Sequence, residues 1–501
     1  MTAMPTAERL AEAVSAADAA MAPLRRSRRR YCAHYAAIGE DAPTGPQPLN
    51  LIHALVSAML PHLLPHRPRA MVRADRAECN AAAERLQRQW NHLAEEIDLA
   101  ATLRGVVTDA LFGAGVMKVG LAATGHSAGV LHDPGRPFAD RVDLDDYLID
   151  PAAARREQAA FEGNRYRLAR RDLLAEDRFD PAAVERLPVR SGAAGAIEDT
   201  VELIDLWLPA HGVIVTLAGD AAAGGAILAE TPYDGPERGP YEWLGFHWLP
   251  GQLLPVPPVA MVFDLHVMIN QVAAKLSRQA QRQKDLVLFD DRVAEEAEQL
   301  REALDGEMVG VQNVDRYRQV SFGGANEAGY RHLEFLFEQF RRIGGNADAL
   351  AGVSAASPTL GQDELLYAGA AARVEDLRSA VVEFTRRVGR KLAWHLWQEP
   401  LSGPATAGDL QRRSEADFLE MHFAIEPHSL APDTPQRRYG RVLEWFQKVL
   451  LPTAEAAAEQ GRPLDAVGLA RMTAGLLNLG DADVHLPPVE GAAATEPKGN
   501  R

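Results

Sequence analysis

The amino-acid sequence predicts an α+β fold that is mainly helical. Several long segments carry apolar residues at steps of three and four, the spacing of a helix with one buried face. Between them, up to about residue 258, short apolar runs alternate with Gly, Pro and Asp turns, which is typical of strands. With 501 residues, 47% of them apolar, the chain can bury a sizeable core and divide into several domains.

The first 44 residues are expected to form an Ala-rich helical arm. The arm contains a basic cluster of five arginines: Arg25, Arg26, Arg28, Arg29 and Arg30. Such a cluster usually lies on a solvated helix face, and a contact with phosphate or with a neighbouring subunit is the alternative.

Two further helices are predicted before the strands begin. Leu51, Leu55 and Met59 recur every four residues and predict an amphipathic helix that is stopped by Pro61 and Pro65. A second apolar stripe predicts one long helix over residues 74–111, which the glycines of FGAGVMKVG break before a strand starts.

The strand region contains three runs that predict neighbouring strands, VELIDLWL, GVIVTLA and GAILAE. Turn residues separate these runs, as short strand connections require. The stretch 231–251 is rich in Pro, Gly and aromatic residues, and we expect it to be too irregular for a regular element.

A different order of elements follows from residue 258. Residues 258–284 predict a helix roughly 40 Å long, apolar in its first half and basic in its second. A small mixed module comes next, with DLVLFD as a strand, residues 292–304 as a helix and EMVGVQNV as a second strand. Helices over residues 327–343 and 362–398 follow, separated by a Gly/Ala/Ser-rich stretch. The second of them carries an apolar stripe of Val374, Leu377, Val381, Phe384 and Val388. Two short helices are predicted near residues 435–450 and 463–478.

No pattern indicates a catalytic, cofactor or metal site. GAGVMKVG follows a helix and precedes a strand, the reverse of the dinucleotide-binding order, and no Walker lysine follows a glycine loop. The four aspartates of RVDLDDYLIDP lack the glycine and the distal glutamate of an EF-hand, so turn capping is predicted. His62 and His66 stand beside prolines, and Cys32 and Cys79 form no CxxC pair. We therefore expect neither a cofactor nor enzymatic activity.

The charge balance limits the classes of nucleic-acid partner. Acidic residues outnumber basic ones, 69 against 53, and the formal charge is −16. This argues against a repressor, polymerase or nuclease, which would present a basic face, but it suits a conduit through which DNA slides. Positive charge is nevertheless concentrated at the end of segment 258–284, in Lys275, Arg278, Arg282 and Lys284, where a solvated helix face is the alternative.

The order of elements carries a resemblance to a known family. Two long helices bracket a small mixed module and are followed by a loop and a longer helix. The phrases DALFGAGVMKVG, DLDDYLIDP and GVSAASPTLGQDELLYAGAAARVEDLRSAVVEF fall at matching places. Across most of its length the chain thus resembles the portal (head-to-tail connector) proteins of tailed bacteriophages and gene-transfer-agent-like particles. It departs from them at Thr359-Leu360-Gly361-Gln362, where many relatives carry a Thr-rich start to the last long helix.

The resemblance implies a portal fold with wing, stem, clip and crown, assembled as a ring. Carried onto this sequence, the implied parts are an N-terminal helical arm (1–44), a wing (45–257), a first stem helix (258–284), a clip (285–325), a second stem helix (326–343), a tunnel loop (344–361), a spine helix with a wing return (362–432), a crown (433–485) and a disordered tail (486–501).

Three sets of functional residues follow from the resemblance. The basic end of the first stem helix would face the DNA channel or the subunit boundary, with Lys275, Arg278, Arg282 and Lys284. The clip would join neighbouring subunits through Val287, Leu288, Phe289, Val309 and Val311. The tunnel loop would form the narrowest point of the channel, with Gly344, Gly345, Asp348, Gly352, Ser354 and Gly361; an ordinary helix–helix linker is the alternative.

The implied function is that of a dodecameric ring at one capsid vertex, the channel through which double-stranded DNA is packaged and ejected without sequence specificity. The implied partners are other copies of the chain, the major capsid or scaffold protein, the terminase large subunit and a head–tail adaptor protein, with no membrane. The chain would reside in the virion, and in the host cytoplasm during assembly. A non-enzymatic structural subunit of another large assembly is the main alternative, and an enzyme of unrecognised type is a second.

Overall fold

The structure, a computed structural model, describes most of the chain. The described residues are 4–38, 49–64, 67–122, 127–128, 131–132, 135–176, 178–187, 199–218, 226–304, 306–322, 324, 327–345, 360–399, 415–425, 440 and 443–453. The chain divides into two compact units, Met1–Leu430 and Ala431–Arg501, and the first holds nearly all of the described residues.

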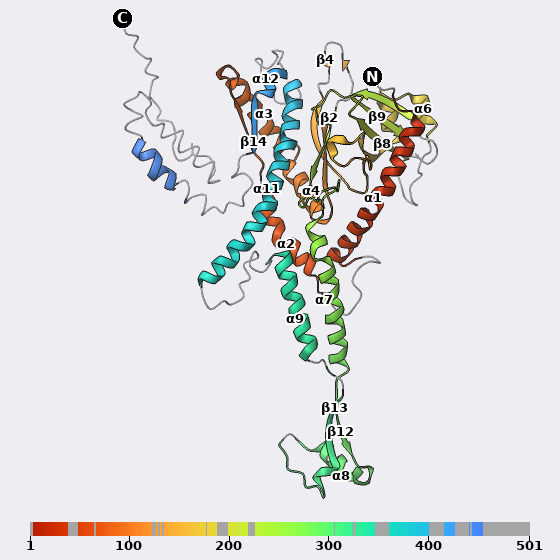
Figure 1. Cartoon of the computed structure of the whole chain (residues 1–501), viewed down its shortest axis with the longest axis vertical. Helices are drawn as coiled ribbons and strands as arrows, with labels where there is room; N and C mark the ends of the chain where they lie inside the picture. The colour runs from red at the N-terminus through yellow and green to blue at the C-terminus, as the bar shows by residue number, and fades with distance from the viewer. Residues whose placement is uncertain are drawn as a thin grey trace, which may run out of the picture. The chain divides into compact units, whose positions relative to one another are not determined.

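Helices form the larger part of the first unit (Figure 1). The long helices are α1 (Ala7–Ala36), α7 (Pro258–Gln281), α9 (Glu327–Gly344) and α11 (Leu360–Gln398). The shorter ones are α2 (Leu51–Leu63), α3 (Asn80–Glu96), α4 (Leu99–Phe112), α5 (Arg170–Ala175), α6 (Pro181–Glu185), α8 (Ala294–Glu302) and α12 (Glu415–Leu419).

The strands described in the structure pair only in antiparallel fashion. A five-stranded sheet has the order β10-β9-β8-β7-β6 and a three-stranded sheet the order β11-β2-β5, while β1 pairs with β14, β12 with β13 and β3 with β4. Their bounds are β1 (Ala70–Ala74), β2 (Gly115–Ala122), β3 (Ser127–Ala128), β4 (Leu131–His132), β5 (Arg136–Val142), β6 (Tyr147–Ile149), β7 (Glu162–Ala169), β8 (Thr200–Leu208), β9 (Val213–Ala218), β10 (Ile227–Pro232), β11 (Tyr241–Leu244), β12 (Lys284–Phe289), β13 (Tyr317–Phe322) and β14 (Met421–Ile425). This mixture of helix and strand agrees with the predicted α+β class.

The three runs predicted as neighbouring strands are β8, β9 and β10, and they pair in that order. The stretch 231–251, predicted to be irregular, contains β11, which pairs with β2 and sets Trp243 opposite Val116. All four residues of β11 are buried, so the strand shows no alternation of apolar and polar residues by which it could be predicted.

The main hydrophobic core lies where α11 packs on α2, α3 and the sheet that contains β2. The predicted stripe of α11 is buried in it: Val374, Leu377, Val381, Phe384 and Val388. At Gly389 the helix comes so close to its neighbours that an added Cβ would lie 2.6 Å from the Phe423 ring. Because this contact leaves no room for a side chain, the position requires glycine. Trp90 of α3 also donates a hydrogen bond to the Gly389 carbonyl oxygen at 2.9 Å, which holds the two helices together here.

The single helix predicted over residues 74–111 is wrong. Strand β1 ends at Ala74, a 3₁₀ turn follows at Ala77–Cys79 and α3 begins only at Asn80, while Asp98 separates α3 from α4. Asp98 has a left-handed φ of 46°, and its carboxylate accepts a hydrogen bond from the Ala101 N–H at the start of α4. Buried leucines continue on both sides of the break, at Leu93 and Leu99, so apolar spacing alone conceals it.

Helix α2 includes Pro61 and ends at Leu63, between the two prolines that were predicted to stop it. Pro61 lies in the last turn, so few helix hydrogen bonds depend on it, and the Leu64 N–H still donates to the Leu60 carbonyl. Leu63 and Leu64 are buried in the core, which holds this turn in place.

In the second unit, the described residues are helical, and Phe446–Leu450 is a π-helical turn. This agrees with a short helix predicted near residues 435–450. The remainder of the predicted crown, including a second helix near 463–478, and the predicted tail lie outside the described residues.

Candidate functional site

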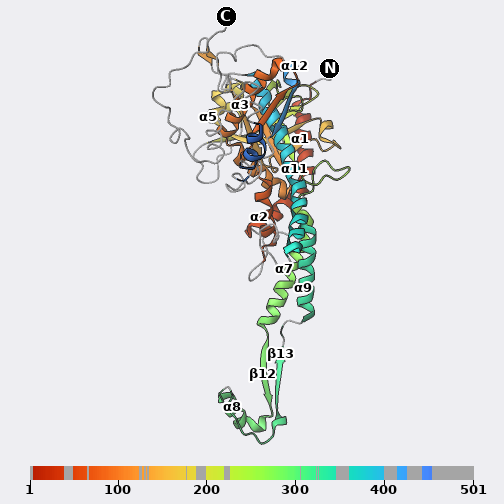
Figure 2. The same ribbon diagram turned by 90° about the vertical axis from the view of Figure 1, so that its left-hand side faces the viewer.

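Helices α7 and α9 correspond to the two predicted stem helices. They lie side by side in both views (Figures 1 and 2), run antiparallel and are joined by the module that contains β12 and β13. Leu336 and Phe340 of α9 are buried in the core cluster, and Gly344 lies against Val262 of α7. The pair is therefore a two-helix hairpin.

By length and hydropathy alone, α7 is the one helix among the described residues that could cross a membrane. Its apolar first half is in the core, where Val262 and Ile269 are buried among residues of α2 and α4. The core helix of a soluble protein has the same length and composition, so this single helix is weak evidence of a span.

The hairpin of β12 and β13 exposes nearly all of its side chains. Lys284 stands opposite Phe322 and Phe289 opposite Tyr317, and none of the other strands in the described residues pairs with them. The apolar residues of β12 are between 42% and 59% exposed: Leu286, Val287, Leu288 and Phe289. Two strands without a covered face are marginally stable, so the hairpin offers apolar surface and two open strand edges to another molecule.

The second strand of this module does not lie at EMVGVQNV, where the sequence predicted it. Asn313 accepts a hydrogen bond from the Asp315 N–H at 2.9 Å and starts a 3₁₀ turn, so the strand begins only at Tyr317. Val309 and Val311 are therefore outside the hairpin and half-buried. Of the predicted clip interface, only Val287, Leu288 and Phe289 share one strand.

The four predicted channel residues gather at one end of α7. Lys275 and Arg278 lie in its last turns, Arg282 caps it and Lys284 begins β12. All four side chains are exposed, and none forms an ion pair with another residue that the structure describes. Their charge is available to a molecule outside this chain.

The predicted tunnel loop is described only at its two ends. Gly344 ends α9, Gly345 follows with a left-handed φ of 88°, and Gly361 lies in the first turn of α11. Asp348, Gly352 and Ser354 lie outside the described residues.

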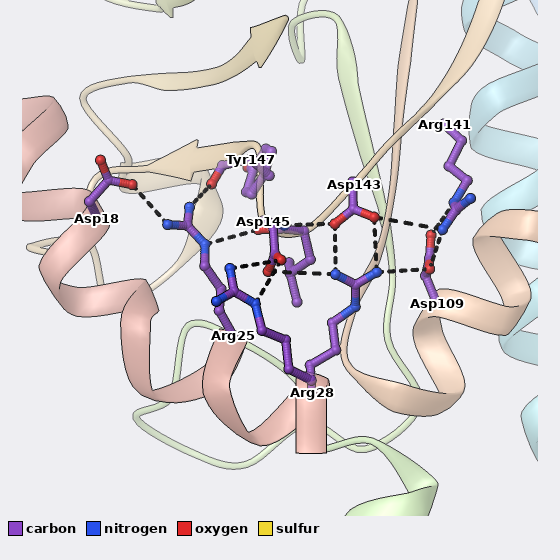
Figure 3. A network of polar contacts seen from close by, with 10 residues as sticks. Asp18, Arg25, Arg28, Asp109, Arg141, Asp143, Asp145 and Tyr147 are labelled. Atoms are coloured by element: carbon purple, nitrogen blue, oxygen red, sulfur yellow. Dashed lines mark hydrogen bonds and ion pairs between the residues drawn. The ribbon is translucent and has the colours of Figure 1, made fainter. Parts of the chain in front are cut away.

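The arginine cluster of α1 is only partly solvated, contrary to the prediction. Arg28 contacts Asp143 at 2.6 Å and Asp109 at 3.4 Å (Figure 3). Arg25 donates to the carbonyl oxygen of Tyr147 at 2.7 Å and pairs with Asp18 at 2.8 Å. Both arginines are buried, and they attach α1 to the turn before β6.

A signal for this arrangement is present in the sequence. Positions 10, 14, 17, 21, 25 and 28 follow one another at helical steps of three or four, and all six are buried. Arg25 and Arg28 therefore continue the apolar face of α1, and the aspartates of RVDLDDYLIDP supply the opposite charge. Capping, as predicted, is a second role of these acids, because Asp143 accepts from the Asp145 N–H at 2.9 Å.

Ion pairs determine the direction in which the pKa values of this network shift. Burial alone would lower the pKa of Arg28, but Asp143 and Asp109 raise it above its ordinary value. Burial alone would raise the pKa of Asp143, but Arg28 lowers it. Both groups therefore stay charged near neutral pH, and the network has the properties of a structural clamp.

Replacing Arg28 by methionine should reduce the free energy of unfolding by about 3 kcal/mol, because Asp109 would lose one of its partners inside the protein. Arg29→Met is the matched control. Arg29 is 65% exposed and pairs with Asp145 at 3.0 Å, so its loss should cost about 0.5 kcal/mol or less. Chemical denaturation of both variants measures the difference, and equal losses would show that Arg28 is not a clamp.

A second buried network joins α11 to β11. Lys391 donates to the Tyr241 carbonyl oxygen at 2.6 Å and pairs with Glu242 at 3.0 Å, and Arg387 pairs with Glu242 at 3.0 Å. Arg156 approaches the same carboxylate at 3.5 Å. Burial lowers the pKa of Lys391 to about 8, although Glu242 opposes the shift.

Two buried histidines connect α1 to α7. Nδ1 of His34 lies 3.2 Å from Nε2 of His266, and the His34 ring meets Phe263 edge-on. Burial and the neighbouring His34 lower the pKa of His266 to about 4, so it is neutral at neutral pH. The pair fits a packed helix contact.

The search for a metal centre among the described residues is negative. No group of three or more His, Cys, Asp or Glu side chains is placed to hold a metal ion among the described residues. An open groove of about 450 Å³ lies between α1 and residues 252–257, and its walls are mainly apolar. The stem helices α7 and α9 and the β12–β13 hairpin expose apolar and basic side chains that could contact other molecules.

No family model matches the chain, and no curated protein matches it.

Proposed function

We propose that the chain is a portal protein, one subunit of a ring through which DNA enters and leaves a capsid. The observation that carries the proposal is the succession of α7, the exposed β12–β13 hairpin, α9 and the long helix α11. The resemblance to portal proteins implies this order as stem, clip, stem and spine. A two-helix hairpin that holds a small module away from the core suits a platform for docking other proteins.

Exposed apolar side chains on the stem support assembly with other subunits. Met261 and Met268 of α7 and Phe335 and Ile343 of α9 are each 44–53% exposed. Large apolar side chains repeated along one feature are typical of an interaction surface. In a ring, neighbouring stems would cover them.

The proposed partners follow from the same parts. The β12–β13 hairpin, as the clip, would meet the terminase large subunit during packaging and a head–tail adaptor protein afterwards. The basic end of α7 would face the channel or the subunit boundary, and the segment between α9 and α11 would narrow the channel. The formal charge of −16 per chain suits a wall that DNA passes without binding.

Purified protein is expected to form closed rings of twelve subunits, or of thirteen when it is made alone. Negative-stain microscopy gives the symmetry, and light scattering gives the mass. A chain that stays monomeric at every salt concentration, with scaffold protein present, would contradict the proposal. An open filament or another symmetry would favour a structural subunit of a different assembly.

A further inference from the structure

The end of α1, the segment before α2 and the first half of α7 meet at one place (Figure 1). A fully buried histidine, His266 of α7, lies there. Its Nε2 lies 3.2 Å from Nδ1 of His34 on α1, and its Nδ1 lies 3.4 Å from Nδ2 of Asn270. We call these three residues the His266 cluster. Both nitrogens of the His266 ring therefore face a polar atom of the protein.

Hydrogen bonds to Leu49 fix the orientation of the Asn270 amide. Its Oδ1 accepts from the Leu49 N–H at 2.7 Å, and its Nδ2 donates to the Leu49 carbonyl oxygen at 3.0 Å. The other hydrogen of Nδ2 is shared between the carbonyl oxygen of His266, at 3.0 Å, and Nδ1 of the same residue. An amide nitrogen can only donate, so these bonds assign Nδ1 of His266 as an acceptor without a proton. The neutral ring then carries its hydrogen on Nε2 and donates it to His34.

This arrangement suits a neutral His266 and opposes a charged one. Protonation would place a hydrogen on Nδ1, where it would point at the Asn270 amide, which is also a donor. Two donors would then face each other, and the positive charge of the ring would be buried away from water. Burial and the neighbouring His34 accordingly lower the pKa of His266 to about 4.

The charged groups on the surrounding elements do little to stabilise a charged His266. The Arg30 guanidinium lies 4.9 Å from the centre of the Phe263 ring, which also meets His34, so it adds positive charge nearby. Asp109 of α4 is already paired with Arg28 and Arg141. Several further charged or titratable groups are exposed, so water screens them: Asp264 of α7, His53 of α2, and Glu338, Arg341 and Arg342 of α9. The other titratable side chains at this end of α1 are Tyr31, Cys32 and Tyr35.

We propose that the His266 cluster is an acid-sensitive contact: protonation of His266 separates it from Asn270 and His34 and so releases the end of α1 and the start of α2 from α7. The place where α7 leaves the core would then open locally as the pH falls. Because the folded chain holds His266 neutral, the contact is complete above the ordinary pKa of 6.5 and is lost as the pH falls toward about 4. The inference does not rest on the proposed function.

Hydrogen exchange of the purified chain at pH 7 and pH 5 tests the proposal, with rates corrected for the intrinsic effect of pH. In the opened state His266 would bind a proton at its ordinary pKa of 6.5, so the open population should rise about twentyfold between these pH values. Peptides that cover residues 30–38, 49–56 and 262–272 should show this loss of protection. Peptides from the buried stripe of α11 should not.

Three variants identify the group that binds the proton. His266→Gln removes the proton site and keeps an amide that can donate to His34, so protection of the three segments should not change between pH 7 and pH 5. His53→Gln, on the exposed face of α2, is the matched control and should lose protection as the unaltered chain does. Asn270→Asp should act in the opposite direction. Its carboxylate would pair with protonated His266, so the three segments should be better protected at pH 5 than those of the unaltered chain.

Each outcome decides for or against the cluster. An unaltered chain whose three segments stay protected at pH 5 would overturn the proposal, and so would a His266→Gln chain that still loses protection. Loss of the response in His53→Gln would assign the proton to His53 instead. If His266→Gln is already open at pH 7, Asn270→Asp decides: protection kept at pH 5 supports the cluster, and the same loss as in the unaltered chain rules it out.

Discussion

On the proposed function, particles in which this chain lacks the tip of the hairpin module should neither package DNA nor gain tails. The change removes residues 290–316 and joins Phe289 to Tyr317 through Asn-Gly. Phe289 and Tyr317 are paired across β12 and β13, so the two-residue turn Asn-Gly can connect the strands at this point. The rest of the chain keeps its core, because the removed segment contributes to none of the main clusters.

The expected loss follows from where the module sits. The tip contains α8, whose side chains are mostly exposed, and β12 beside it leaves four apolar residues exposed. A docking partner would cover this surface, and without it the terminase and the adaptor would have no platform. We expect packaged DNA per particle and the tailed fraction to fall by more than tenfold, an effect of about 1.4 kcal/mol or more on docking.

Ring assembly shows whether a loss of packaging comes from lost docking or from a misfolded chain. Rings of the shortened chain should form and enter capsids, because the exposed apolar side chains of the stem lie outside the tip. A matched control replaces Arg171 and Asp172 of α5, an exposed ion pair outside the module, by alanine; docking should change little. Shortened portals that still support packaging and tail joining would show that the module is not the docking platform.

The long helices could be predicted from the sequence, because their apolar spacing is set by their own packing. The stripe from Val374 to Val388 is continuous, and the structure buries all of its predicted members. Helices α7 and α9 start and end within a few residues of the predicted bounds. Local periodicity and glycine stops are enough where one helix face meets a core.

The elements that were missed depend on contacts distant in the chain. Strand β11 is recognisable only once β2 lies beside it, and the turn at Asp98 interrupts an apolar pattern that continues through it. Arg25 and Arg28 were predicted to be solvated because their partners, such as Asp143, lie more than 100 residues away. Spacing within one segment carries no information about such partners.

The buried network around Glu242 could likewise not be predicted from the sequence, because its members come from three separate segments. Glu242 belongs to β11, Lys391 and Arg387 to α11, and Arg156 to the turn before β7. Lys391 and Glu242 are each 5% exposed or less. One carboxylate is therefore the shared ion-pair partner of buried Lys391 and of two partly buried arginines where α11 meets the sheet.

Replacing Glu242 by glutamine should lower the free energy of unfolding by about 3–5 kcal/mol. The amide fits the same space but leaves the buried Lys391 without its counter-charge, which is the costly way to break a buried pair. Glu230→Gln on exposed β10 is the matched control, with an expected change of about 0.5 kcal/mol or less. The double variant Glu242→Gln with Lys391→Met should recover part of the loss, which a double-mutant cycle measures.

The same substitution should change how stability depends on pH. Burial alone would raise the pKa of Glu242, but Lys391, Arg156 and Arg387 lower it below its ordinary value of 4.5. A carboxyl group whose pKa is lower in the folded than in the unfolded chain stabilises the fold at pH values above its unfolded-state pKa. This contribution is lost as the pH falls through its folded-state pKa. Between pH 7 and pH 3 the unaltered chain should therefore lose a contribution to its free energy of unfolding that the Glu242→Gln variant lacks. The difference in unfolding free energy between the two proteins should narrow accordingly. Curves of unfolding free energy that stay parallel down to pH 3 would show that Glu242 is not the charge that holds α11 to the sheet.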